Sequence, residues 1–283
     1  MLIFSSNQVF AEYGTEATVE IEEIIVKASW RETKLEKADA SIFVIGQEVL
    51  IDQPVKHFEQ LTQMIPNLNW AGGSSRPRYF QIRGIGERSG YEGTPNSSVG
   101  FIIDDIDFSG LGGIATTFDL EQVEVHRGPQ GLRMGANALA GLIYMQSKNP
   151  TDAFEGIAEL VYGSDDIKSL GIAMGGPIDE EEKLKYRVVL RQDEVNGFRN
   201  NSWLAKDNTS GKKEFTGRIK LNWQPNSAST IDFLLMNVDL ENGYDAWTMD
   251  NSLSTLSDKP GRDSQDTNAM GLKMRFRLHD KFE

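Results

Sequence analysis

The stretch FDLEQVEVHRGPQGLRMGANALAGLIYMQSKNP, residues 118–150, is the part of the sequence that decides the fold. Alternating apolar residues predict a strand around Val123 and Val125. The strand ends at Gly128 and Pro129, because proline cannot donate a hydrogen bond to a strand ladder. Small residues follow, and a second strand is expected at residues 142–146. Since few side chains project between the two strands, their backbones can approach each other closely.

Composition narrows the class of protein. Of the 283 residues, 39% are hydrophobic and 25% are charged, which is near the norm for globular chains. No run of about 18 apolar residues is present, which excludes a transmembrane helix but not membrane strands, because strands alternate their faces. The net charge of -13 argues against nucleic-acid binding, and the lack of cysteine excludes disulfides and thiol catalysis.

Several further elements are expected ahead of this stretch. Strands are predicted at residues 41–45 and 80–83, and a buried strand is predicted at residues 99–103. Apolar residues at helical spacing predict one helix over residues 52–65, which Pro66 ends.

Four motifs in this part of the chain resemble the plug domain of TonB-dependent outer-membrane receptors. They are, in order, residues 61–66, Ile82-Arg83-Gly84-Ile85, residues 101–105 and Glu124-Val125-His126-Arg127-Gly128-Pro129. The resemblance implies an α+β plug domain, a small mixed sheet with short helices, followed by part of an antiparallel transmembrane β-barrel. The residues that it marks as the plug signature are Gly84, Gly128, Pro129 and Gly141.

Six alternating segments follow the plug motifs. They are residues 155–162, 168–176, 184–191, 215–224, 229–238 and 267–279. Several alternate over nine or more residues, which suits a tilted membrane strand better than a typical soluble strand of five or six. Short connections alternate with long ones, as expected when turns face the periplasm and loops face outside. The alternative is a soluble β-sandwich, which does not require this asymmetry.

The polar faces of these segments are mainly basic. Their cationic residues are Lys185, Arg187, Arg191, Arg218, Lys220, Lys273, Arg275 and Arg277. A basic inner wall would complement an acidic plug, and it would also concentrate anionic ligands such as ferric chelates. The first interpretation needs no ligand. Asp104, Asp105 and Asp107 are accordingly expected to face solvent or basic barrel residues rather than a metal ion.

The N-terminal part contains an isolated strand-like segment. Its residues Glu22, Glu23, Ile24, Ile25 and Val26 are similar to the TonB box of the family. The family uses this box as an extended segment that the energy-coupling protein TonB captures by strand addition. From the pattern alone, an ordinary edge strand is the alternative interpretation.

Charged residues at the plug motifs have an implied role. Arg83, Glu124 and Arg127 stand at expected strand ends beside glycines, from where they could reach the barrel wall. In the family, arginines at these positions pair with barrel carboxylates and lock the plug, and the resemblance carries this role to Arg83 and Arg127. The alternative is that these charges only keep the strand ends soluble.

No catalytic arrangement is found, so an enzyme is not expected. His57, His126 and His279 share no metal-ligand spacing, and His57 is expected at the surface of the plug helix. Neither a metal nor a cofactor is expected.

The expected organisation has three parts. Residues 1–20 are a signal remnant or disordered leader, residues 21–150 hold the TonB box and plug, and residues 151–283 begin the barrel with about six strands. Six strands are fewer than the eight of the smallest barrels. The chain is therefore expected to be a piece of a longer protein or a truncated product.

The resemblance implies TonB-dependent active transport of a nutrient across the outer membrane of a Gram-negative bacterium. The nutrient most common in the family, a ferric siderophore complex, is the one expected. The expected partners of the chain are TonB, outer-membrane lipid and a small-molecule ligand, and the complete protein is expected to be a monomer. The alternatives are a soluble periplasmic plug-like binding or sensing module and a non-functional truncated receptor.

Overall fold

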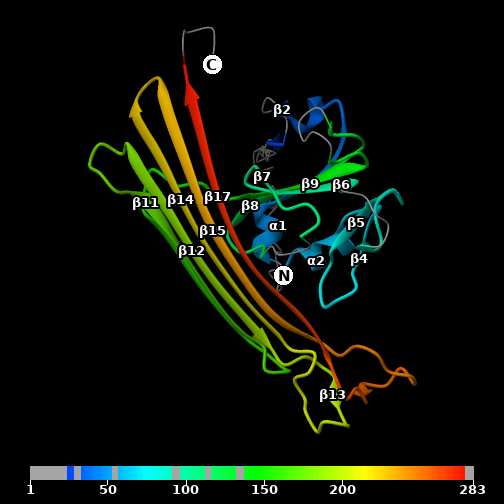
Figure 1. Ribbon diagram of the computed structural model, residues 1–283. Coiled ribbons are helices and arrows are strands. Elements are labelled where there is room, and N and C mark those ends of the chain that lie inside the picture. Colours follow the sequence, from blue (N-terminus) through cyan, green and yellow to red (C-terminus); the bar gives the residue numbers. More distant parts are fainter. Residues whose placement is uncertain are drawn as a thin grey trace, which may run out of the picture.

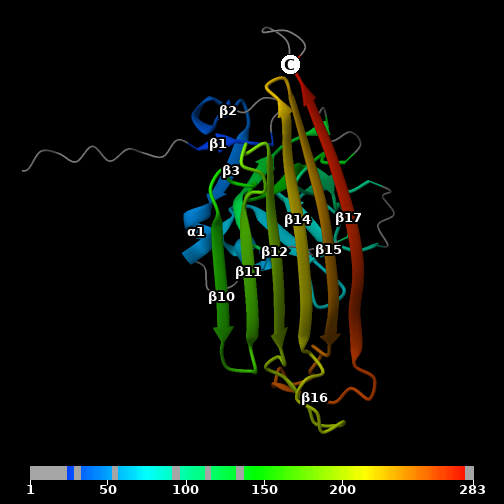
Figure 2. The ribbon, with the colours of Figure 1, turned by 90° about the vertical axis from the view of Figure 1, so that its left-hand side faces the viewer.

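The computed structural model describes residues 24–28, 33–52, 57–90, 96–111, 116–131 and 137–277. A plug domain, extending to Ser147, packs against the concave side of a curved six-stranded sheet, which is called the wall below (Figure 1). Turned by 90°, the wall strands run side by side with the plug behind them (Figure 2). The expected fold class, a mixed plug followed by antiparallel barrel strands, is confirmed.

The plug is built on a five-stranded sheet in the order β3-β8-β9-β6-β7. Its strands are β3 (Ser41–Gly46), β6 (Val99–Ile103), β7 (Ile106–Asp107), β8 (Leu120–Arg127) and β9 (Gly141–Ser147). The sheet is mixed, because β9 pairs antiparallel with β8 and parallel with β6. The strands predicted around Val123 and Val125 and at residues 142–146 are β8 and β9. Val123, Val125 and Ile143 lie in the core of the plug.

Gly141 shows why small residues are needed between β8 and β9. Its φ is 156°, and a Cβ atom there would lie 2.3 Å from the carbonyl oxygen of His126. No real side chain tolerates such a contact, so this position requires glycine.

Small elements complete the plug. They are β1 (Ile25–Val26), β2 (Thr33–Lys34), β4 (Leu68–Ala71) and β5 (Tyr79–Ile82), the 3₁₀ turns η1 (Leu35–Lys37) and η2 (Thr62–Met64), and the helices α1 (Gln47–Asp52) and α2 (Phe58–Leu61).

The single helix predicted over residues 52–65 is wrong. Helix α1 ends at Asp52, two residues before Pro54, because a proline disfavours helical backbone in the residue ahead of it. A new helix, α2, begins after His57, whose Nδ1 accepts the backbone N–H of Glu59 at 3.4 Å.

The wall is an antiparallel meander in the order β10-β11-β12-β14-β15-β17. Its strands are β10 (Glu155–Tyr162), β11 (Lys168–Pro177), β12 (Leu184–Val195), β14 (Lys212–Asn226), β15 (Ser229–Tyr244) and β17 (Gly261–Phe276). All six predicted strands are confirmed. The last four are longer than expected, at 12, 15, 16 and 16 residues. Two short strands, β13 (Asn200–Asn201) and β16 (Ser254–Thr255), pair across the two long loops.

In the wall, apolar side chains cover the exposed outer face and charged side chains lie on the buried inner face, which is the reverse of a soluble sheet. On its outer face Leu160, Met270 and Leu272 are 81%, 71% and 60% exposed, whereas Arg187 and Arg218 on its inner face are 3% and 2% exposed. Within the described residues, no helix has the length and apolar character needed to cross a membrane. The apolar outer face and charged inner face are those of a barrel strand set in lipid.

Candidate functional site at the interface of plug and wall

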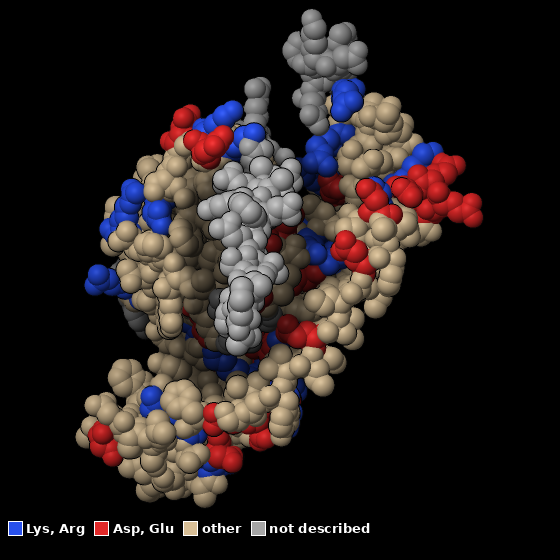
Figure 3. All heavy atoms as spheres, turned by 180° about the vertical axis from the view of Figure 1, so that it is seen from behind, with Lys and Arg blue, Asp and Glu red and all other residues tan. Residues whose placement is uncertain are grey.

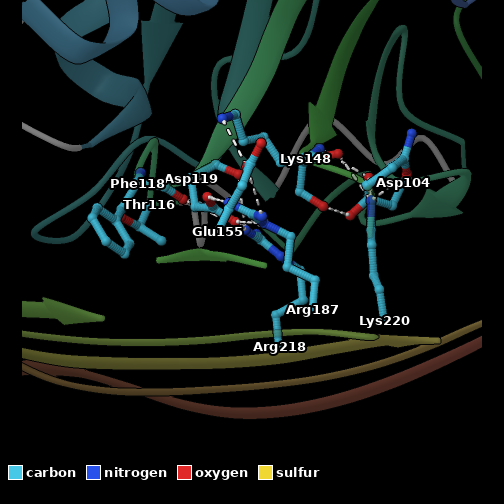
Figure 4. A network of polar contacts seen from close by, with 11 residues as sticks. Asp104, Thr116, Phe118, Asp119, Lys148, Glu155, Arg187, Arg218 and Lys220 are labelled. Carbon is cyan, nitrogen blue, oxygen red and sulfur yellow. Dashed lines mark hydrogen bonds and ion pairs between the residues drawn. The ribbon is translucent and has the colours of Figure 1, made fainter. Parts of the chain in front are cut away.

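Asp119 of the plug is the centre of the first group of plug–wall contacts. Its carboxylate accepts two hydrogen bonds from the guanidinium of Arg187 on β12, of which that from Nε is 2.8 Å long. Arg218 on β14 donates to the Asp119 carbonyl at 3.2 Å and lies 3.6 Å from its carboxylate. All three side chains are buried, and the two wall cations share this one plug carboxylate (Figure 4). Glu155 of β10 adds a second negative charge 3.6 Å from Arg187.

Asp104 forms the second contact. Lys220 on β14 donates to its carboxylate and to the Ser147 carbonyl, both at 2.9 Å. The backbone N–H and hydroxyl of Ser147 hold the same carboxylate at 2.9 and 2.6 Å. Next to it, Lys273 on β17 pairs with Asp105 at 2.9 Å. The prediction that Asp104 and Asp105 face basic barrel residues is therefore confirmed, whereas Asp107 binds Asn137 within the plug.

Phe118 fits the plug against β11 and β12. Its ring lies 5.3 Å below the guanidinium of Arg191, which also pairs with Glu159 and Asp193. Opposite the ring stands Gly171, where a Cβ atom would lie 2.8 Å from the Phe118 side chain. The wall thus has a glycine at the point where the plug has an aromatic ring.

A third contact lies near the long loops. Arg76, in the plug turn between β4 and β5, is fully buried and donates through Nε to Asp263 of β17 at 3.0 Å. Ser75 and Arg78 donate to the same carboxylate at 3.1 and 2.9 Å. Three plug donors therefore meet one wall carboxylate, the opposite polarity to the Asp119 contact.

Two weaker pairs join α2 to the start of β14. Glu59 pairs with Lys212 at 2.9 Å, and His57 lies 3.5 Å from Glu214. The expected surface position of His57 is wrong, because its side chain faces the wall at this point. Burial raises the pKa of Glu59, but the charges of His57 and Lys212 outweigh burial and hold it below its usual value.

A cavity of about 350 Å³ borders this interface between α1, residues 117–120 and the strands β10 and β12. Asp119, Lys148, Glu155 and Arg187 are among its lining residues. Basic and acidic side chains also lie close together along the seam of plug and wall in the view from behind (Figure 3). Although most of its lining surface is apolar, a cavity of this size has room for several water molecules next to these charged side chains.

The three residues predicted to lock the plug lie elsewhere. Arg83 is exposed, Arg127 contacts Ser41 and the ring of Phe43 within the plug, and Glu124 lies under the N-terminal segment. Within the described ranges, none of the three has a hydrogen bond or ion pair with the wall strands. Their locking role remains a prediction.

The segment similar to a TonB box is only partly described. Glu22 and Glu23 lie outside the described residues, whereas Ile25 and Val26 form β1 and pair with β2. The signature residues lie at turns: Gly84 follows β5, and Gly128 and Pro129 follow β8. The role of the box is a prediction that the geometry leaves open.

Sequence reasoning missed the main contact residues of the plug, Asp119 and Arg76. A signal was present for Asp119, since it is an acidic residue directly ahead of the strand predicted around Val123 and Val125, and the inner face of the wall is basic. For Arg76 the turn between β4 and β5 gives no periodic pattern, and only the tertiary fold places it against β17.

Fold and interface together define a plug held against the inner face of an outer-membrane-type β wall. Residues 34–142 match the family model described as TonB-dependent Receptor Plug Domain. The chain is 25% identical over 204 residues to the pesticin receptor of Yersinia pestis, covering 71% of this chain and 30% of that receptor. Residues 34–142 therefore belong to the plug domain family of TonB-dependent receptors, and the matching relatives are receptors of that kind.

Solved structures show the same fold. The ferric yersiniabactin uptake receptor FyuA from Yersinia pestis matches with a TM-score of 0.73 and 22% identity, over 85% of this chain and 39% of that one. The ferripyoverdine receptor of Pseudomonas aeruginosa matches with a TM-score of 0.69 and 17% identity, over 88% of this chain and 34% of that one. The chain spans 27% to 30% of the length of the pesticin receptors that it matches.

Proposed function

We propose that this chain is the plug and first wall strands of a receptor that transports a nutrient, a ferric siderophore complex, across the outer membrane. TonB supplies the energy by capturing the segment around residues 22–26. The curated relatives include a ferric enterobactin receptor and a vitamin B12 transporter, and the solved relatives include a ferric yersiniabactin uptake receptor, a ferripyoverdine receptor and a siderophore receptor. That likeness supports the ligand class, while the plug–wall interface supports the mechanism.

The observation that carries the proposal is the ionic seam between Asp119, Asp104 and the cations of β12 and β14. A plug that closes a pore at rest and moves when TonB pulls on it needs contacts that water molecules can replace. Hydrogen bonds to carboxylates meet this need, because water replaces them at little enthalpic cost once the seam opens. The cavity beside Arg187 gives water a place from which to enter.

The exposed apolar residues of the outer face support the membrane setting. Side chains such as Leu160, Met270 and Leu272 form a surface that water disfavours and lipid accepts. A soluble periplasmic plug-like module has no use for this surface, and a truncated receptor without function would leave it exposed in the periplasm. Outer-membrane lipid is therefore the proposed neighbour of the wall.

The test is growth of a bacterium that lacks the receptor containing this chain. Iron is supplied as single ferric siderophores, with ferric citrate and vitamin B12 as comparison nutrients. The proposal expects growth on one ferric siderophore to be lost and to return with the intact gene, but not when residues 22–26 are deleted. Normal growth of the knockout on every iron source, or restoration by the deletion variant, contradicts it.

A further inference from the structure

The segment of residues 24–28 lies on the face of the plug sheet, across β8. Val26 and Ala28 are buried there, and Ala28 packs in one apolar cluster with Ile102, Leu142 and Tyr144. The segment is therefore docked on the plug.

One backbone edge of this segment is paired with β2. Ile25 stands opposite Lys34 and Val26 opposite Thr33 in an antiparallel ladder. The backbone N–H of Leu35 also donates to the Ile24 carbonyl at 2.9 Å. A strand has two edges, so this pairing leaves one for another partner.

Side chains of β8 occupy that second edge. Gln122 donates from Nε2 to the Ile25 carbonyl at 3.0 Å, and the backbone N–H of Lys27 donates to Glu124 at 2.6 Å. Residues two apart in a strand present their backbone groups on the same edge, so both contacts lie on the edge that β2 leaves open. The Ala28 N–H adds a further bond to Glu124 at 3.2 Å.

Glu124 is well placed for this role. Its carboxylate is fully buried and is also bonded by Gln122 at 2.5 Å and by His126 at 2.6 Å. Hydrogen bonds from an N–H to a carboxylate are roughly twice as strong as those between neutral groups. Gln122 thus offers the segment a hydrogen-bond donor and Glu124 offers it an acceptor, as the backbone of a neighbouring strand would.

We propose that Gln122 and Glu124 form a side-chain cap on the open edge of residues 24–28, which competes with a partner strand for the same backbone groups. This proposal rests on the proposed function, in which the partner is an extended strand of TonB. The segment must leave Glu124 before a strand can be added to that edge, so the cap sets how readily the receptor is captured.

The test uses the whole receptor that contains this chain, with the periplasmic domain of TonB as the probe. Three variants are compared with the unaltered receptor: Glu124→Ala, the conservative Glu124→Gln, and the control Glu48→Ala, which removes an exposed carboxylate on α1 away from the segment. Amide hydrogen exchange of residues 24–28 reports on docking, and calorimetric titration reports on affinity for the probe.

We expect Glu124→Ala to speed exchange in the segment and to raise the affinity for the probe about tenfold, the equivalent of ~1.4 kcal/mol. Glu124→Gln keeps one acceptor oxygen and gives intermediate values, while Glu48→Ala changes neither measurement. If Glu124→Ala fails to fold, Gln122→Ala removes only the Ile25 contact and gives a smaller shift in the same direction.

The outcomes separate the two proposals. Faster exchange with unchanged affinity overturns the competition and leaves the proposed function standing, since the probe still binds. Unchanged exchange in Glu124→Ala overturns the cap itself. If the probe binds no receptor, altered or not, the proposed function is contradicted and the competition falls with it.

Discussion

Two adjoining parts of the interface between plug and wall are unlike, and they are called the charged half and the apolar half below; β17 adds further ion pairs beyond them. On β12 and β14 the wall presents Arg187 and Lys220, which are bonded to plug carboxylates. On β15, the next strand, Met236 and Val238 belong to the same apolar core as residues of the plug sheet such as Phe101. One half is held by charge and the other by burial of apolar surface.

The two halves differ in how easily water can replace their contacts. Water can replace a hydrogen bond to a carboxylate, but it cannot replace apolar contacts without a cost proportional to the exposed area. The plug is therefore expected to separate from β12 and β14 before it separates from β15. Four substitutions test how differently the two halves hold the plug.

The largest effect is expected for Asp119→Ala in the charged half. It leaves Arg187 and Arg218 buried without their shared carboxylate, and loss of one partner of a buried pair costs about 3–5 kcal/mol. Urea unfolding of the purified receptor measures the cost. Asp119→Asn, which keeps a hydrogen-bond acceptor of the same shape, serves as the control and should lose less. A change below ~1 kcal/mol for the alanine variant would show that water already compensates the two cations.

Met236→Ala tests the apolar half and should cost about 2–5 kcal/mol, because it leaves a cavity in the shared core of plug and wall. The matched control is Met270→Ala on the outer face of the wall, where lipid fills the vacated space. Thermal unfolding of both variants in detergent compares them. Equal losses at the two positions would argue that β15 does not share a core with the plug.

Leu272→Arg tests the outer face of the wall and should cost about 2–4 kcal/mol if the residue lies near the middle of the membrane. Lys273→Arg, on the inner face of the same strand, keeps its charge beside Asp105 and should be nearly neutral. Folding into lipid vesicles in urea gives both values. A tolerated arginine at position 272 would be incompatible with a lipid-facing surface.

The smallest effect is expected for Glu59→Gln, about 0–1 kcal/mol, since Glu59 and Lys212 are only partly buried. Because the pKa of Glu59 is lowered in the folded protein, its charge stabilises the fold above the usual value of 4.5. That contribution is lost as the pH falls through the lowered pKa. Unfolding of both proteins at neutral and acidic pH should show the difference shrink in acid. A constant difference would mean that the carboxylate charge contributes nothing.

Much of this fold is predictable because its determinants are local. Period-two alternation predicts every wall strand, and the turn at Gly128 and Pro129 predicts the end of β8. The helix predicted over residues 52–65 does not form, because Pro54 lies inside it and the backbone of His57 is extended. The basic inner face is also visible in the sequence, but the partners of those cations are not, since Asp119 and Arg187 are 68 residues apart.

Strand period and turn chemistry act between near neighbours, so the sequence alone predicts the two-faced wall. Its motifs carry the resemblance that implies the family and the mixed plug. Only the tertiary structure decided that Asp119 and Asp104 bind wall cations, that Arg76 meets Asp263, and that Glu124 turns to the N-terminal segment. These pairings join residues far apart in the chain. They form because a charge removed from water is costly unless an opposite charge lies next to it, and the packing of distant strands supplies that charge.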